Sequence, residues 1–190
     1  MAFEKANTAL LIVDLQKDYF PGGNMPLQDS LEASSQARRL LEHFRQNDLP
    51  VVFVQHLSTR PGATFFIPGT HGVEFHDDVC PLPGETIIQK HFPNSFRGTT
   101  LLDHLRSQQI EHLVISGMMT HMCLDATTRA AFDYGFACTV AGDACATRDL
   151  TYAGEKIPAR QVHLSFLAAL NGVYAKVVSA EEILSGKLIA

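Results

Sequence analysis

Apolar runs of strand length alternate with segments of helical periodicity along most of the chain. The runs TALLIVD (8–14) and VVFVQH (51–56) are apolar almost throughout, which is typical of strands buried on both faces of a sheet. Between them, from Ser30 to Phe44, apolar side chains recur at helical spacing. The same alternation predicts further strands at 86–90, 112–117, 136–144 and 173–179, and helices at 100–108, 121–134, 158–170 and from 179 onward.

This order of elements predicts an α/β fold of the doubly wound, Rossmann-like kind. We expect three layers, with a mostly parallel six-stranded sheet and helices on both of its faces. Capping boxes at Thr100–Asp103 and Ser179–Glu182 support two of the helix starts. A length of 190 residues suits one domain, so residues 1–190 are predicted to form a single unit. Ligands of such sheets bind beyond the carboxyl ends of the strands.

The segment 57–85 has no regular pattern and is rich in proline, glycine and histidine. A connection of that length in a compact domain is usually functional or disordered, and we predict that it covers part of a pocket. Its phenylalanines, Phe65, Phe66 and Phe75, would form an apolar patch if they were exposed. We therefore expect a homo-oligomer, a dimer or tetramer, in which this segment or 92–96 packs near a neighbour.

Composition and charge exclude several classes of binding partner. A formal net charge of −5 and the absence of a Lys/Arg cluster argue against a nucleic-acid-binding surface. No run of 18 or more apolar residues is long enough to span a membrane, and the N-terminus lacks the pattern of a signal peptide. We therefore expect a cytoplasmic location. The 4 cysteines fit neither a disulfide framework nor a Cys-x-x-Cys zinc motif.

Three polar residues fall at or just beyond predicted strand ends: Asp14, Lys90 and Cys123. Each has an ordinary interpretation, respectively a turn or helix cap, a solvated surface lysine and a buried inert thiol. Those interpretations do not explain why all three fall where a doubly wound sheet places its active site. We therefore predict that they form one catalytic site.

The chemistry of a thiol nucleophile connects the three side chains. Cys123 is predicted in the first turn of the 121–134 helix, where unpaired N–H groups favour an anion. Lys90 would stabilise the thiolate further, and Asp14 would accept the thiol proton and pass it to a leaving amine. The same first-turn N–H groups would suit an oxyanion. An amide-like bond of a small molecule is the predicted substrate.

The chain resembles the isochorismatase-like cysteine hydrolase superfamily over nearly its whole length. The resemblance lies in LLIVDLQKDYF (10–20), PGETIIQKHFPNSFRGTTLLDHL (83–105), LVISGMMTHMCLDATTRAAFDYGF (113–136) and GDACAT (142–147). Members with this pattern use an Asp–Lys–Cys triad, which maps onto Asp14, Lys90 and Cys123. The resemblance also implies a cis peptide between Met118 and Met119, which would turn the Met119 N–H, with that of Cys123, toward the substrate oxygen. Relatives are commonly dimers or tetramers.

Departures from the superfamily pattern narrow the expected activity. Nicotinamidases in this superfamily bind a metal through an Asp-x-His pair, whereas the matching stretch here is FVQHLSTR (53–60). We therefore predict no metal site and no cofactor, although His56, His71 and His76 leave a metal site as an alternative. Isochorismatases, which cleave a vinyl ether, often lack the nucleophilic cysteine, so Cys123 favours cleavage of a C–N bond. A vinyl-ether hydrolase and a non-catalytic binding protein remain the alternatives.

Residues that flank the triad motifs are candidates for substrate contacts. For the aromatic ones, packing in the core is an equally good interpretation, and Gln16 would either brace Asp14 or begin a helix. Arg97 and Arg148 would meet a substrate carboxylate or be surface charges. The predicted substrate-binding residues are Gln16, Phe20, Phe92, His121 and Tyr152.

Overall fold

The computed structural model describes residues 7–186. Its strands are β1 (Thr8–Val13), β2 (Val51–His56), β3 (Thr86–Lys90), β4 (His112–Met118), β5 (Ala137–Ala146), β6 (Leu150–Tyr152), β7 (Glu155–Ile157) and β8 (Lys176–Val178). Its α-helices are α1 (Ser30–Gln46), α2 (Leu101–Ser107), α3 (Asp125–Asp133), α4 (Ala159–Leu170) and α5 (Ala180–Leu184). Short 3-10 helices span Lys17–Tyr19, His71–Val73 and Asp77–Val79, and a π-helical turn spans Thr120–Leu124.

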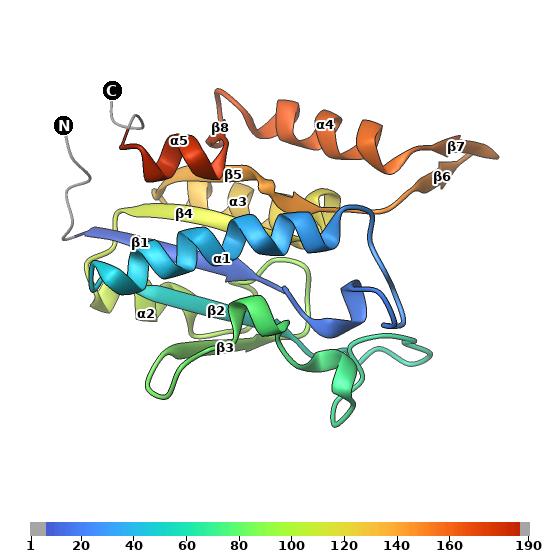
Figure 1. Cartoon of the computed structure of the whole chain (residues 1–190), viewed down its shortest axis with the longest axis horizontal. Coiled ribbons are helices and arrows are strands. Elements are labelled where there is room, and N and C mark those ends of the chain that lie inside the picture. The colour runs from blue at the N-terminus through green and yellow to red at the C-terminus, as the bar shows by residue number, and fades with distance from the viewer. Residues whose placement is uncertain (1–6, 187–190) are drawn as a thin grey trace.

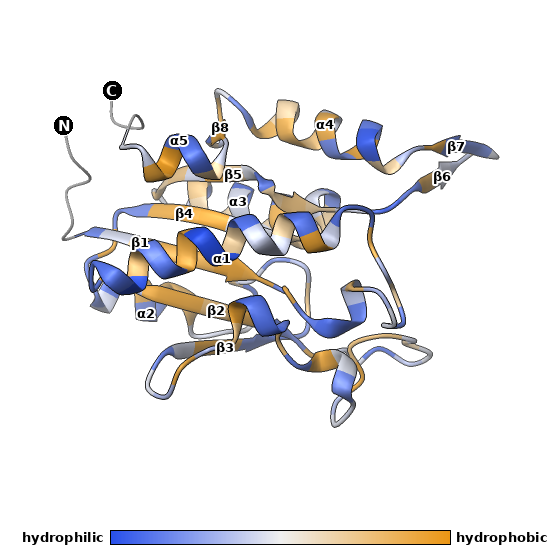
Figure 2. Ribbon diagram, viewed as in Figure 1, coloured by the Kyte–Doolittle hydropathy of each residue, from blue (hydrophilic) through white to orange (hydrophobic). Residues whose placement is uncertain are grey.

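Six strands form one sheet in the order β3-β2-β1-β4-β5-β8, and all neighbouring pairs in it are parallel. The central strand β1 is fully buried. Its alternate side chains enter two separate cores, with Leu10 and Ile12 in one and Leu11 and Val13 in the other. This explains why the strand has no polar face: both faces of the sheet are covered (Figures 1 and 2).

Helices α1 and α5 cover one face of the sheet, and α2, α3 and α4 cover the other (Figure 1). In α1, Ala37, Leu40 and Leu41 point into the first core. In α2, Leu101 and Leu105 point into the second. The predicted three-layer, doubly wound α/β fold is therefore confirmed. None of the helices in residues 7–186 is both long enough and apolar enough to cross a membrane.

Several local predictions need correction. Residues 150–157 form an antiparallel hairpin, β6–β7, which projects from the body of the molecule (Figure 1) and which the apolar pattern did not reveal. The Thr100 side chain does not cap α2; instead, Thr99 Oγ1 accepts from the N–H of Leu101 at 3.3 Å. The capping box at Ser179 and Glu182 is present.

The segment 57–85 folds onto its own chain. Because Phe66 and Phe75 are buried, they do not form the exposed apolar patch on which the expectation of a homo-oligomer was based. The Asp18 carboxylate, itself buried, fixes this segment by accepting from the N–H of Phe66 at 2.6 Å. Gly72 makes this possible, since a Cβ at that position would overlap the carboxylate. Oligomeric assembly therefore remains a prediction without that support.

The strand order reverses its direction between β1 and β4, which makes their carboxyl ends the switch point of the sheet. Gly117, near the end of β4, has a φ of +139°, and a Cβ there would overlap the carbonyl oxygen of Val13. Glycine is thus required for the close approach of the two strands at this edge. The chain leaves β1 and β4 there through Asp14 and Met119, respectively.

Candidate active site

Asp14 is the first residue after β1 and has a left-handed backbone, with a φ of +54°. Aspartate tolerates this conformation better than most residues do. The backbone N–H of Asp14 donates to the carbonyl of Val54 in β2 at 3.0 Å, which anchors the turn to the sheet. The residue is completely buried, so its carboxylate must be compensated by a partner within the protein.

Lys90, the last residue of β3, supplies that partner. Its Nζ lies 2.7 Å from Asp14 Oδ2, and neither side chain is exposed. The ammonium also donates to the carbonyl oxygens of Phe92 and Pro93, each at 3.2 Å. Burial, the largest single influence, lowers the pKa of Lys90, but the charges and hydrogen bonds of Asp14 and Cys123 together outweigh it, and the pKa is raised. Lys90 is therefore charged at neutral pH.

Cys123 lies in the π-helical turn between β4 and α3 and is 3% exposed. Its sulfur, an Asp14 oxygen and a ring nitrogen of His56 all lie within 4.8 Å of one another. Burial, followed by the charge of Asp14, raises the pKa of the Cys123 thiol, and Lys90 offsets only part of this. This raised pKa favours a neutral thiol beside the Asp14 carboxylate over the thiolate that the sequence suggested.

The three predicted catalytic side chains are thus brought together at one site. The peptide bond between Met118 and Met119 is cis. Beside the thiol is a cavity of about 380 Å³, which we call the Cys123 cavity. Its lining residues are Tyr19, His56, Ser58, Thr59, Arg60, Phe65, Phe66, His91, Phe92, Pro93, Met119, Met122 and Cys123.

Only some of the predicted substrate contacts reach this cavity. Phe92 lines it, as does Met119, whose N–H was predicted to bind the substrate oxygen. Gln16 lies behind the wall, where it accepts from the N–H of His56 at 2.7 Å and donates to the carbonyl of the same residue at 2.9 Å. Phe20 lies outside the cavity wall and stacks on the ring of His76 at 3.8 Å.

His121 and Tyr152 also lie outside the wall. His121 contacts the hydroxyl of Thr147 instead, with 2.5 Å between Nδ1 and Oγ1. Tyr152 is 79% exposed because it belongs to the projecting hairpin β6–β7. Arg97 and Arg148, the two arginines considered for a substrate carboxylate, do not line the Cys123 cavity. Arg97 stacks over the ring of Phe92 instead, with 3.8 Å between the guanidinium carbon and the ring centroid.

Several wall residues were not predicted from the sequence, and His56 is the most informative of them. It ends β2 just as Lys90 ends β3, and the two are register partners. The strand-end argument that selected Lys90 therefore applied to His56 as well. The segment 57–85 covers part of this cavity, as predicted, and contributes Phe65 and Phe66 to its wall. Tyr19, from the 3-10 helix Lys17–Tyr19, had no comparable signal in the sequence.

The cluster of Asp14, His56 and Cys123 has the donor set of a metal site, with an oxygen, a nitrogen and a sulfur. Lys90 already contacts both the Asp14 oxygen, at 2.7 Å, and His56 Nδ1, at 3.2 Å. A metal ion at this cluster would have to displace the lysine ammonium from both atoms. The arrangement of Asp14, His56 and Cys123 therefore fits the Lys90 ammonium as its cation better than a bound metal ion.

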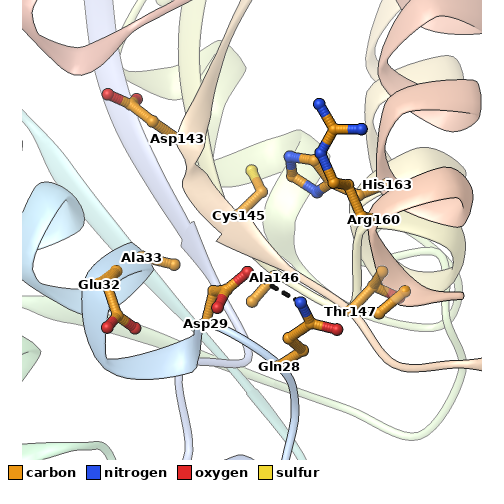
Figure 3. A pocket seen from close by; sticks show the side chains of 11 residues that line it. Gln28, Asp29, Glu32, Ala33, Asp143, Cys145, Ala146, Thr147, Arg160 and His163 are labelled. Atoms are coloured by element: carbon orange, nitrogen blue, oxygen red, sulfur yellow. Dashed lines mark hydrogen bonds between the residues drawn. The ribbon is translucent and has the colours of Figure 1, made fainter.

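A second opening lies at the carboxyl end of β5. We call it the Cys145 cleft; it has a volume of about 200 Å³ and is shown in Figure 3. Acidic side chains of Asp29, Glu32 and Asp143 border it, together with Arg160 and His163. Hydrogen bonds join the cleft to the π-helical turn: the Thr120 hydroxyl lies 2.9 Å from His163 Nδ1 and donates to the carbonyl of Ala146 at 3.2 Å, and His121 contacts the hydroxyl of Thr147.

The fold and the site define an α/β protein with a buried carboxylate, ammonium and thiol at the switch point of its sheet. The model of the isochorismatase domain matches residues 8–182. The uncharacterized isochorismatase family protein YddQ of Bacillus subtilis is 49% identical over 177 residues, which are 93% of this chain and 98% of that protein. This chain therefore belongs to the isochorismatase family of hydrolases.

Solved structures agree with this assignment. A crystal structure described as an isochorismatase hydrolase from Oleispira antarctica has a TM-score of 0.92 and 48% identity, and the match covers 98% of this chain and 100% of that one. N-carbamoylsarcosine amidase from Thermoplasma acidophilum has a TM-score of 0.78 and 26% identity, with 93% and 98% of the two chains covered.

Proposed function

We propose that this chain is a metal-independent cysteine hydrolase that cleaves an amide-like C–N bond of a small molecule. The observation that carries the proposal is the buried pair of Asp14 and Lys90, 2.7 Å apart, with the Cys123 sulfur within 4.8 Å of an Asp14 oxygen. A buried ion pair is costly to maintain and contributes little to stability by itself. Its position beside a thiol at the switch point of the sheet gives it a chemical purpose.

In the acylation half of the reaction, Asp14 acts first as a base and then as an acid. The thiol proton of Cys123 moves to the Asp14 carboxylate as the sulfur attacks the carbonyl carbon of the substrate. The C–N bond then breaks, and the same proton passes from Asp14 to the leaving nitrogen, so that the amine departs neutral. The acyl group remains on Cys123 as a thioester.

Water completes the cycle. Asp14 takes a proton from the attacking water molecule, the C–S bond breaks, and the proton returns to the sulfur as the carboxylic acid leaves. Lys90 holds the carboxylate in position through both halves and offsets the negative charge that develops on the sulfur. We assign the backbone N–H groups of Met119 and Cys123 to the oxygen of the tetrahedral intermediate, because both residues line the cavity.

The cavity supports a small substrate with an apolar or aromatic part. Its volume of about 380 Å³ is near the lower end for ligand pockets. Tyr19, Phe66 and Phe92 provide aromatic wall, and Arg60 adds one positively charged side chain. The similarity to N-carbamoylsarcosine amidase, whose name states cleavage of an amide, agrees with C–N cleavage.

Intact-protein mass spectrometry after incubation with a panel of small amides and carbamoyl compounds tests the proposal. The expected result is a covalent adduct on Cys123, with the mass of the acyl half, and release of the amine. Cys123→Ala should form no adduct. Hydrolysis of a vinyl ether by Cys123→Ala, with no amide cleaved by the unmodified protein, would instead indicate an isochorismatase-type activity and contradict the proposal.

A further inference from the structure

His56 has the geometry of a group that acts on the substrate. It ends β2 beside Lys90, its register partner on β3. Its backbone is held on both sides by the Gln16 amide, which accepts from the N–H at 2.7 Å and donates to the carbonyl at 2.9 Å. Its ring lies 5.7 Å from that of Phe66 and forms part of the wall of the Cys123 cavity. The position of the imidazole is therefore fixed before any substrate binds.

The contact with Lys90 determines which ring nitrogen carries the proton. Lys90 Nζ lies 3.2 Å from His56 Nδ1, and an ammonium group can only donate hydrogen bonds. Nδ1 must therefore accept, and in a neutral imidazole the proton then lies on Nε2. Burial lowers the pKa of His56 to about 4, which keeps the ring neutral at physiological pH.

Nε2–H is left available. Among residues 7–186, no group accepts a hydrogen bond from it, whereas Nδ1 and both backbone groups of His56 are occupied. The ring lines a cavity together with the nucleophile, and one of its nitrogens is within 4.8 Å of the Cys123 sulfur. Because the attacked carbon becomes bonded to that sulfur and the imidazole lines the same cavity, an oxygen on this carbon can be placed within hydrogen-bond reach of Nε2–H.

We propose that His56 is a further catalytic residue, whose Nε2–H donates to the oxygen that becomes negatively charged when Cys123 attacks. The inference rests on the proposed function, which supplies the tetrahedral intermediate. Lys90 then has two tasks at once, since it pairs with Asp14 and also fixes the tautomer of His56. As a neutral donor, His56 stabilises the oxyanion without taking part in proton transfer.

Two substitutions of His56 provide the test. His56→Gln keeps an oxygen that can accept from Lys90 and an N–H close to the original Nε2, whereas His56→Leu keeps only the approximate volume. With an amide that the unmodified protein cleaves, His56→Leu should lower kcat by roughly a hundredfold, with little change in KM. His56→Gln should lower kcat by about tenfold or less. His71→Leu, at an exposed histidine, is the matched control and should not change either constant.

A second readout does not depend on turnover. Benzaldehyde labelled with ¹³C at its carbonyl carbon can add to Cys123 to form a hemithioacetal, whose formation is followed by NMR. His56→Leu should weaken this addition about as much as it lowers kcat, and His56→Gln should weaken it less. Thermal unfolding of each variant, followed by circular dichroism, separates a catalytic loss from a loss of fold.

Three results would overturn the assignment. Equal activity and equal benzaldehyde affinity of His56→Leu and the unmodified protein would show that Nε2–H contacts nothing that matters. Equal losses in the Gln and Leu variants would show that the ring only fills space. The third result is a loss of the unmodified protein's activity on dialysis against a chelator, with recovery on addition of zinc. If His56→Leu showed no such zinc-dependent recovery, His56 would be a metal ligand. If the unmodified protein cleaves no amide yet the benzaldehyde results hold, the proposed function fails and the donor role of His56 does not.

Discussion

The Cys123 cavity and the Cys145 cleft share no lining residue, and each contains a buried cysteine. Burial raises the pKa of both thiols, that of Cys145 to about 12. The Cys145 sulfur donates to the carbonyl of Ala141 at 3.2 Å, and residues 7–186 place no carboxylate–ammonium ion pair beside it. Cys123 has that pair. Burial therefore does not distinguish the two thiols, whereas the carboxylate–ammonium pair beside Cys123 does.

The charges of the two regions also differ in exposure. Asp14 and Lys90 are fully buried and are paired with each other. In the Cys145 cleft, Glu32, Asp143 and Arg160 are exposed to solvent and form no ion pair with one another in the described part of the chain. Water screens such charges and weakens their interactions. The comparison predicts that substitutions in the first region affect chemistry and folding strongly, and those in the second weakly.

The largest effect is expected from Cys123→Ala, which should lower turnover of a cleaved amide by roughly five to six decades because it removes the nucleophile. Cys145→Ala is the matched control and should keep turnover close to that of the unmodified protein. Steady-state assays on both variants decide the matter. Comparable losses in the two would mean that the cleft takes part in the reaction and that the comparison is mistaken.

Asp14→Asn should lower turnover by roughly two to four decades, because an amide cannot accept the thiol proton. Asp143→Asn changes a carboxylate of the Cys145 cleft in the same way and should have little effect on turnover. Circular dichroism of both variants shows whether the fold is retained. Near-normal turnover of a folded Asp14→Asn variant would show that Asp14 has only a structural role, in the turn after β1.

Lys90→Met should destabilise the protein by about 3–5 kcal/mol, since it leaves the Asp14 carboxylate buried without a partner. Lys17→Met removes a more exposed pair, with Glu74 at 3.0 Å, and should cost about 1 kcal/mol or less. Urea unfolding measures both. The double variant Asp14→Asn/Lys90→Met should recover part of the stability lost in Lys90→Met; no recovery would argue against a direct coupling of the two side chains.

The pKa of His56 predicts a smaller, pH-dependent effect on stability. In the unfolded chain a histidine titrates near 6.5, whereas in the folded protein the pKa of His56 is about 4. Between these values the unfolded state binds more protons, so the free energy of unfolding decreases as the pH falls from 6.5 to 4. His56→Gln should remove part of that decrease. An unchanged pH dependence in this variant would assign the effect to the other half-buried histidines whose pKa is lowered by burial, His76, His112, His121 and His163.

The smallest effect is expected from removal of metal ions. Activity should survive dialysis against a strong chelator, because the Lys90 ammonium already occupies the place of a cation between Asp14 and His56. Elemental analysis and an activity assay after dialysis provide the measurement. A loss that zinc or iron restores would identify a metal site among the histidines and contradict the proposal.

The apolar pattern of the sequence was sufficient to predict the sheet because the parallel strands are buried on both faces, and burial of this kind leaves continuous apolar runs. The same rule of strand ends brought Asp14, Lys90 and Cys123 to one place, and it would have selected His56 as well. The β6–β7 hairpin escaped prediction because its strands are short and mostly exposed. Tyr152 was therefore expected at the site, although it lies on a projection.

The cavity wall and the protonation state of the nucleophile were harder to predict. Phe66 has a φ of +57°, which is rare for a bulky residue, and it is held there by the carboxylate of Asp18. A local sequence pattern cannot predict this contact, because Asp18 and Phe66 are 48 positions apart in the sequence. The helix terminus near Cys123 suggested a thiolate, but the cost of burying a charge is not visible in a sequence.

The attachment of the 57–85 segment to Asp18 has a consequence for how such an enzyme diversifies. The proposed reacting groups come from the ends of β1 and β3 and from the π-helical turn after β4, whereas Phe65, Phe66 and Arg60 come from a loop outside the sheet. Insertions or substitutions between residues 57 and 66 can therefore reshape the substrate pocket while the nucleophile and its base stay in place. Exchanging this segment between relatives, with Asp18 and Gly72 retained, is a direct route to new substrate preferences on an unchanged catalytic core.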